Sequence, residues 1–585
     1  MMMHENAVLN IMSILAKLEI LKQNVMGSFD AGAFETVKCF ISVGYKHRRA
    51  VVFTGVGNAK DASFVAAQEH ALKFIESQGA EPPWLKLDIV TMEKKLTMDE
   101  FQSLASSIKK YYFKYGISFD DVYSTAFLQQ EVNAGGLIKY TPSENAKSNP
   151  SEEISALIEL SKEECSAHVD AELNYVNINT YLKTVRYPSS AISDEPLSEI
   201  IIFETKSWFF DENKLIEMDD AEFCTSRRKI DNLSADMTKD LLIKMSRYLA
   251  STVEESGRFV YGYISGFNKV LPTYNCVRHA VGVYSLCETY LVTKDESLRE
   301  PIKKAMTYFV DKFIYSVDDY AFVVEFESTN EIKLGALGVA VLAIDKYLEV
   351  FDEKDHYLPL MQKIGNAICY TQNPATGQFT HVLSHPNLAV VDKFRTVYYS
   401  GEATLALIRL HARDNNEKWL RTIHRAFDYF IKRDYWKNYD HWLACCTNEL
   451  TAILPEDKYF EFGLKNIFSN LEFIEKRITT WATFLEMLTA SNAMIKNIRV
   501  NDKDYLLEGY DIDLFHRVMK IRAERMLNGI FFPEVAMYCK SPETILYGSF
   551  VRHHIFRVRI DDVAFHLLGY CHYLTDVLEA NLIVE

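Results

Sequence analysis

Acidic and aromatic residues stand together at two points in the second half of the sequence. Glu402 follows Tyr399 in the run Tyr-Tyr-Ser-Gly-Glu, and Asp440 is followed directly by His441 and Trp442. Carboxyl groups can act as general acid, general base or nucleophile in the cleavage of a glycosidic bond. Both carboxyl groups also suit the first turn of a helix, so a capping role is an equal alternative for each.

The densest group of charged side chains lies near the C-terminus. If residues 551–560 are extended, His553, Arg557 and Arg559 share one face and apolar side chains cover the other. Two arginines held in this way could bind a carboxylate or a phosphate in bidentate fashion. Because the chain has a net charge of -16, we predict the anion site here. A solvated charged strand is the alternative, and Asp561 or Asp562 is expected to cap the next helix.

Two further segments place polar groups at the start of an apolar stretch. Arg278 and His279 are either a structural pair or substrate contacts, with His279 as an acid or base. Trp481 is either a core residue or a surface for a sugar ring. The predicted catalytic residues are therefore Glu402, Asp440, His279, His441, Tyr399 and Asp562. The predicted substrate-binding residues are Arg278, Trp442, Trp481, His553, Arg557 and Arg559.

The elements that must position these groups are helices, which the hydrophobic pattern predicts from residue 236 to the end. Six charged, amphipathic segments alternate with six segments that have fewer charges and more small residues. A helix buried on most sides is of the second kind, and a helix with one wet face is of the first. The alternation predicts an inner ring of helices wrapped by an outer ring, an (α/α)6 toroid. Each candidate group stands at the start of a predicted inner helix.

The segment Tyr398–Leu407, with the sequence YYSGEATLAL, resembles the start of an inner helix in six-hairpin-glycosidase-like proteins. The resemblance covers residues 236–585 and is architectural, so it identifies no single family. It implies a carbohydrate-processing toroid, a class that includes glycosidases, glucuronyl epimerases and some polysaccharide lyases. In such toroids the starts of the inner helices surround one funnel, which is where the candidate groups should meet.

The N-terminal part of the chain has a different hydrophobic pattern. A helix is predicted over residues 1–30, and residues 31–235 mix strand and helix signals typical of a smaller α/β or α+β domain. Gly55 and Gly57 follow a strand signal and precede a helix signal, as in a dinucleotide turn, but the third glycine of that motif is missing. The predicted fold is therefore mainly α, with the toroid domain over residues 236–585.

The composition excludes several classes of protein. A hydrophobic content of 48% is that of a globular chain, and no long basic run suggests nucleic-acid binding. We expect no signal peptide, because the first apolar stretch lacks a basic leader and contains charges. The ten scattered cysteines predict reduced thiols and a cytoplasmic location. No metal site and no cofactor are expected, since no zinc-binding motif is present.

Three functions remain open at this point. The first is an enzyme acting on an anionic, uronic-acid-type saccharide in cytoplasmic surface-polysaccharide biosynthesis or tailoring, such as that of a capsule. Hydrolysis would pair Glu402 with Asp440 or Asp562. Epimerisation or lyase cleavage would need an arginine to neutralise the sugar carboxylate and a base to move the proton, the candidates being His279, His441 and Tyr399.

The second function is that of a non-catalytic saccharide-binding or assembly protein of a membrane-associated polysaccharide synthesis complex. The third is a zinc-dependent peptide cyclase, because lanthionine cyclases share a helical toroid and bind zinc through cysteines and histidine. Cys445 and Cys446 resemble that arrangement loosely, but the Cys-His-Gly segment expected of such cyclases is absent from the sequence.

Overall fold

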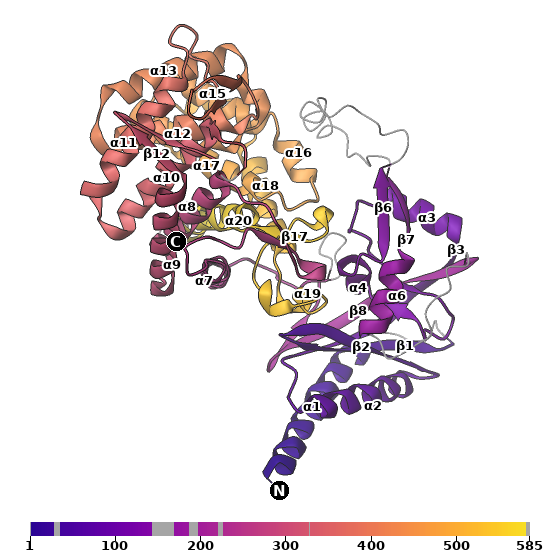
Figure 1. The fold of residues 1–585 in the computed structure, drawn as a ribbon. Helices are drawn as coiled ribbons and strands as arrows, with labels where there is room; N and C mark the ends of the chain where they lie inside the picture. The colour runs from indigo at the N-terminus through magenta and orange to yellow at the C-terminus, as the bar shows by residue number, and fades with distance from the viewer. Residues whose placement is uncertain are drawn as a thin grey trace.

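The structure is a computed structural model that describes residues 2–27, 35–142, 169–185, 197–219, 226–326 and 328–580. It has two parts of unlike architecture, a sheet-rich N-terminal part and a helical C-terminal part (Figure 1). No described helix is long and apolar enough to cross a membrane.

An antiparallel sheet forms the centre of the N-terminal part. Its strands lie in the order β2 (Arg48–Gly57), β1 (Val37–Tyr45), β3 (Trp84–Thr97), β8 (Glu199–Asp211), β4 (Gly116–Ser118) and β5 (Ala126–Phe127), and β9 (Lys214–Glu217) pairs with β8. The other elements of this part are α1 (Met2–Gly27), α2 (Lys60–Gln78), α3 (Met98–Ser107), α4 (Gln129–Ala134), β6 (Ile138–Pro142), β7 (Val169–Leu173) and α6 (Tyr175–Val185). Since the described strands of this sheet pair antiparallel, the architecture is the α+β alternative.

Both faces of the sheet are covered, as strand β1 shows. Its side chains alternate between the two faces, as in any strand. Cys39 and Ile41 join the apolar cluster that α1 and α2 complete, whereas Phe40 joins the cluster that continues into the helical part. Gly55 and Gly57 belong to β2 and therefore form no dinucleotide turn, and a Cβ at either position would overlap α2 at Ser63.

Six of the described helices form a closed inner ring. They are α8 (Cys276–Thr293), α10 (Leu334–Phe351), α12 (Tyr398–Asp414), α14 (His441–Ile453), α17 (Thr483–Val500) and α20 (Ile560–Tyr573). Each packs against the next along the chain, and α20 packs against α8. The outer helices that pack against them are α7 (Ala235–Ser251), α9 (Arg299–Phe313), α11 (Lys354–Thr371), α13 (Glu417–Lys432), α15 (Asp457–Phe468) and α18 (Ile512–Met526). The ring confirms the predicted (α/α)6 toroid.

Burial explains the two kinds of helix that the sequence pattern separates. Inner helix α10 is buried along almost its whole length, which is why it carries small and apolar residues on every side. Outer helix α13 buries one stripe, formed by Trp419, Ile423, Phe427 and Phe430, and leaves its charged residues in water. The inner helices run in the same direction, so their first residues meet at one rim of the toroid.

The last hairpin of the toroid docks on the sheet. It contains α19 (Pro533–Ala536), which packs against β3 and β8. The backbone N–H of Ala50 donates to the carbonyl of Met537 at 2.7 Å, and the hydroxyls of Ser42 and Tyr538 are 2.9 Å apart in a buried contact. These hydrogen bonds join the two parts within a continuous apolar cluster.

Candidate functional site

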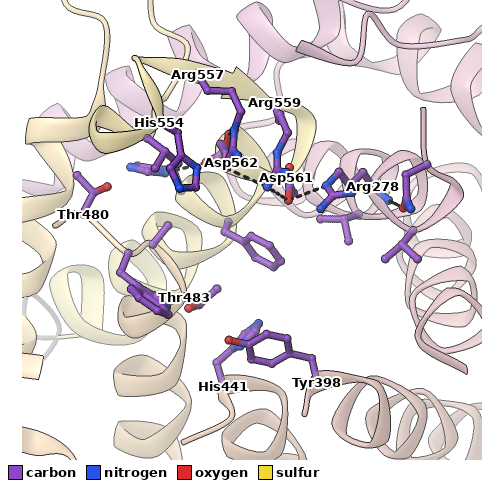
Figure 2. Close-up of a pocket in the computed structure, with 18 of the residues that line it drawn as sticks. Arg278, Tyr398, His441, Thr480, Thr483, His554, Arg557, Arg559, Asp561 and Asp562 are labelled. Atoms are coloured by element: carbon purple, nitrogen blue, oxygen red, sulfur yellow. Dashed lines mark hydrogen bonds and ion pairs between the residues drawn. The ribbon is translucent and has the colours of Figure 1, made fainter. Parts of the chain in front are cut away.

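A cavity of about 550 Å³ lies at the rim where the inner helices begin (Figure 2). Its walls come from the starts of α8, α12, α14, α17 and α20 and from the segments 479–482 and 550–559. The predicted site residues that line it are Arg278, Tyr399, Glu402, His441, Trp442, Trp481, His553, Arg557, Arg559 and Asp562. Residues as distant in sequence as Arg278 and Asp562 meet there because parallel helices share one rim.

His279 and Asp440 do not line the cavity. The ring of His279 is fully buried between α8 and α9, and its nitrogens lie 2.8 Å from the Tyr274 hydroxyl and 2.8 Å from the Ala305 carbonyl. Asp440 is the N-cap of α14 and accepts a hydrogen bond from the Trp442 N–H at 2.9 Å. Both side chains therefore have structural partners, although Oδ2 of Asp440 has none among the described residues, and a role of either residue on a ligand stays a prediction.

Glu402 is the acidic group of the cavity with the most unusual surroundings. It is 5% exposed, and its Oε2 atom has no hydrogen-bond partner among the described residues. It lies in the second turn of α12, one turn later than the sequence suggested, so the helix start stabilises its charge less. Burial raises the pKa of Glu402 to about 8, so the carboxyl group is protonated at neutral pH.

A glycine on the neighbouring inner helix makes room for this carboxyl group. A Cβ added at Gly335 would overlap Oε2 of Glu402 and press on the ring of Tyr399. The α10 segment that contains Gly335 is buried, so neither helix can move away easily. Gly335 therefore keeps Glu402 and Tyr399 in their positions on the cavity wall.

His441, the first residue of α14, lies beside a second buried carboxyl group. Its Nε2 atom is 3.9 Å from Oε2 of Glu486, and neither atom has a hydrogen-bond partner in the described part of the chain. Burial lowers the pKa of His441 to about 3 and raises the pKa of Glu486 to about 8, so both groups are neutral. Sequence reasoning missed Glu486, although one acidic residue in an otherwise apolar inner helix was a usable signal.

Arginine and aspartate side chains form a network along one wall (Figure 2). Nε of Arg278 and Nη2 of Arg559 lie 2.9 Å and 2.8 Å from Oδ2 of Asp561, and Nη2 of Arg557 lies 3.2 Å from Oδ1 of Asp562. Figure 2 shows Tyr398 and His441 on the opposite side of the cavity. The network holds three guanidinium groups against two carboxylates, which leaves one excess positive charge on this wall when both carboxylates are ionised.

The two neighbouring carboxyl groups of the network differ in acidity. Burial alone would raise the pKa of Asp561, but the charges of Arg278 and Arg559 hold it below its ordinary value. Burial and the charge of Asp561 raise the pKa of Asp562 to about 6. One aspartate is thus a fixed anion, while the other can take up a proton just below neutral pH.

The wall segment is not the single strand that the sequence predicted. Residues 552–554 form a 3-10 turn, Ile555 and Phe556 have left-handed backbone angles, and the strand β17 covers Arg557–Arg559 alone. His553 therefore shares no strand face with the arginines. Asp561 and Asp562 lie in the first turn of α20 without capping it, because their side chains bind arginines instead. Within β17 the expected alternation holds, with buried Val558 between the two arginines.

The aromatic side chains contribute unequally to the lining. Trp442 is 1% exposed, and the indole of Trp481 already contacts the Arg477 guanidinium at 4.2 Å and stacks on Phe484 at 5.4 Å. Both tryptophans are therefore largely occupied within the protein. Besides Trp481, the half-buried rings of Tyr398, Tyr399 and Phe565 line the cavity. Phe565, on α20, was not predicted, since its position in the sequence is that of an ordinary apolar residue.

The residues the structure describes contain no group of three or more His, Cys, Asp or Glu side chains that could hold a metal ion. Cys445 and Cys446 are buried in α14, and the thiol of Cys446 donates to the carbonyl of Gly401 at 3.3 Å. Burial raises the pKa of both thiols well above its ordinary value. These cysteines behave as core residues, which gives the peptide-cyclase hypothesis no support.

The sequence matches no protein-family model and no curated protein. Among solved structures, a sugar epimerase from a ruminal bacterium is 13% identical, with a TM-score of 0.43, over 58% of this chain and 98% of that chain. A D-mannose isomerase is 11% identical, with a TM-score of 0.44, over 60% and 100% of the two chains. An unsaturated glucuronyl hydrolase specific for heparin is 10% identical, with a TM-score of 0.41, over 58% and 97%. Similarity at this level does not assign an activity.

Proposed function

We propose that this protein is a carbohydrate-active enzyme that hydrolyses a glycosidic bond in an anionic saccharide, with Glu402 as the proton donor. The observation that carries the proposal is the state of Glu402. A carboxyl group that is protonated at neutral pH, with one oxygen unpartnered among the described residues, lies in the wall of a cavity. Such a group is suited to protonate the leaving oxygen of a sugar.

Hydrolysis also needs a second carboxyl group in a different protonation state. Asp562 lines the same cavity, and the charges of Arg559 and Arg557 oppose the burial that raises its pKa, whereas burial alone raises the pKa of Glu402. The arginines therefore favour the ionised form of Asp562, while Glu402 keeps its proton. We assign Asp562 the role of general base or nucleophile, with Arg557 orienting its carboxylate.

Epimerisation and lyase cleavage are less well supported, because both need a base with a pKa near the working pH. His441 has a pKa of about 3 and would be a weak base. Burial raises the pKa of Tyr399, so its hydroxyl does not ionise near neutral pH. The remaining candidate, His279, lies outside the cavity wall.

The arginine network supports an anionic substrate. A guanidinium group matches the planar fork of a carboxylate, and a partly dehydrated one gains more from an anion than one in open water. The excess positive charge of the Arg278, Arg557 and Arg559 wall is suited to a sugar carboxylate, as in a uronic acid. The tyrosine rings and Phe565 offer apolar surface to the faces of the sugar units.

The test is an assay for new reducing ends on acidic and neutral oligosaccharides, with parallel binding measurements. We expect Glu402→Gln to lower kcat by about 100- to 10,000-fold while binding persists. Glu461→Gln, on the exposed face of α15, is the matched control and should retain full activity. If the wild-type protein binds acidic oligosaccharides and releases no product, the non-catalytic binding alternative replaces the enzyme.

The anionic character of the substrate has its own test. Arg559→Ala should weaken binding of an acidic oligosaccharide by about 2–5 kcal/mol and change binding of a neutral one little. Arg559→Lys should not restore binding fully, because lysine lacks the planar fork. Equal losses for acidic and neutral oligosaccharides would show that the wall serves structure alone.

A further inference from the structure

The sheet domain contains a basic and aromatic segment whose role the proposed function does not use. Residues Lys109–Tyr115, between α3 and β4, have the sequence KKYYFKY. The first four residues form a fixed turn, since the N–H of Tyr112 donates to the carbonyl of Lys109 at 2.9 Å and Tyr111 has a left-handed backbone. Lys109 is partly exposed and Lys110 is exposed.

This turn packs directly against the wall of the toroid cavity. The rings of Tyr111 and Phe556 have centroids 6.3 Å apart, and the Arg552 guanidinium lies 5.3 Å from the centroid of the Tyr112 ring. Arg552 and Phe556 flank His553 and His554, which line the cavity. The sheet domain therefore contacts the segment that carries two cavity-lining histidines, although none of its residues is among those that line the cavity.

Four cationic side chains of the two parts act together on His554. After burial, the influences that lower the pKa of the exposed His554 are the charges of Arg557, Arg559, Lys110 and Lys109. The positive wall of the cavity thus continues across His554 onto the sheet domain. In a chain with a net charge of -16, such a continuous cationic surface concentrates anions locally.

We propose that the turn Lys109–Tyr112 is an outer subsite for the same anionic saccharide, so that the substrate is a chain that extends beyond the cavity. The inference rests on the proposed function. A cavity of about 550 Å³ has the size of a small-ligand pocket, so the further units of a longer chain must pass over its mouth. Lys109 and Lys110 would bind their carboxylates, and the sheet domain would set the preference for chain length.

The experiment compares the Kd of a disaccharide with that of an octasaccharide on the full chain, by calorimetry at fixed ionic strength. Galacturonan and hyaluronan fragments serve as probes, since both carry uronate groups. For the wild-type protein we expect the octasaccharide to bind about tenfold more tightly than the disaccharide. In Lys109→Ala/Lys110→Ala that ratio should fall to about two, and added salt should reduce the wild-type ratio as well.

The matched control is Lys94→Ala/Lys95→Ala, another exposed lysine pair of the sheet domain, which contributes no residue to the junction. It removes the same charge and should keep the wild-type ratio. A wild-type ratio retained in Lys109→Ala/Lys110→Ala overturns the outer subsite and leaves the proposed function standing. If the wild-type protein binds neither length of either probe, the anionic-saccharide function fails and the subsite fails with it.

Discussion

Two buried glutamates near the cavity rim differ from the charged groups towards the other end of the inner ring. At the cavity rim, Glu402 and Glu486 are buried with oxygens that lack hydrogen-bond partners among the described residues, and burial raises the pKa of each. Towards the other end of the same helices, charged groups are matched: Glu288 contacts Lys346 at 3.2 Å and His572 at 3.4 Å. There the pKa of Glu288 is lowered, because its two cationic neighbours outweigh its burial.

We call the matched groups the charged base, which comprises Glu288, Asp345, Lys346, Arg409, Glu449 and His572. Arg409 lies 2.8 Å from Glu449 and 3.8 Å from Asp345, so this end closes the barrel with ion pairs between neighbouring helices. Removing one partner of a buried ion pair destabilises the fold, because it leaves an uncompensated charge, whereas an unpartnered carboxyl group remains available to a ligand. The comparison therefore supports the proposed site at the rim and a structural role for the base.

The largest effect should come from breaking the charged base. Arg409→Ala leaves the half-buried carboxylate of Glu449 without its cation and leaves Asp345 with Arg413 alone, and we expect a loss of about 3–5 kcal/mol in the free energy of unfolding. Urea titration followed by circular dichroism measures it. Arg421→Ala, at an exposed position of α13, is the control and should change stability by less than about 0.5 kcal/mol. A loss as small as the control's would show that the base is not structural.

At the rim, Glu402→Gln should make the protein more stable than the wild type, by an amount that grows as the pH rises. The pKa of Glu402 is about 8 in the folded protein and 4.5 in its ordinary state, so the unfolded chain loses the proton first and wild-type stability falls between these values. Glutamine removes this dependence. We expect the variant to gain about 2–4 kcal/mol on the wild type between pH 5 and pH 8, from urea titrations at both pH values. Parallel stability curves would contradict a protonated Glu402.

Crowding the rim should have a smaller effect on folding. Gly335→Ala places a methyl group against the Glu402 carboxyl group and the Tyr399 ring, and we expect a loss of about 1–3 kcal/mol with weakened ligand binding. Thermal unfolding and calorimetry measure the two effects. Gly27→Ala, where a Cβ would meet no atom within 4 Å, is the control. If Gly335→Ala binds the ligand as tightly as the wild type, this glycine does not support the binding site.

The smallest effect should be a pH-dependent one at the base. Glu288 raises the pKa of His572 against the opposing influence of burial, so the stability from the charged imidazolium is present below pH 6.5 and is lost as the pH rises through the raised pKa. His572→Gln should therefore cost about 1 kcal/mol at pH 6 and less at pH 9, by urea titration. A loss of stability that grows with pH would contradict a charged imidazolium at His572.

The architecture was accessible from the sequence because it depends on repetition. An inner helix such as α10 carries charge only in its last two turns, and an outer helix such as α13 carries it along one side, so the alternation predicts a closed double ring. The cap at Asp440 could also be predicted, because capping depends only on residues within one turn.

The site itself was decided by tertiary structure. Arg278 and His279 are adjacent, but successive helical residues point about 100° apart, so one faces the cavity and the other is buried beneath it. Which of the two faces inward depends on where the axis of the ring lies. Asp561 and Asp562 likewise look identical in sequence, and their different acidities follow from which arginines reach each of them.

The sequence by itself therefore determined the ring and the rim at which its candidate groups gather, because both follow from local periodicity. It could not determine that Glu402 holds a proton, since that depends on an opening left by Gly335 on another helix and on the absence of a nearby cation among the described residues. A pKa is a property of everything packed around a group, and those neighbours come from distant parts of the chain.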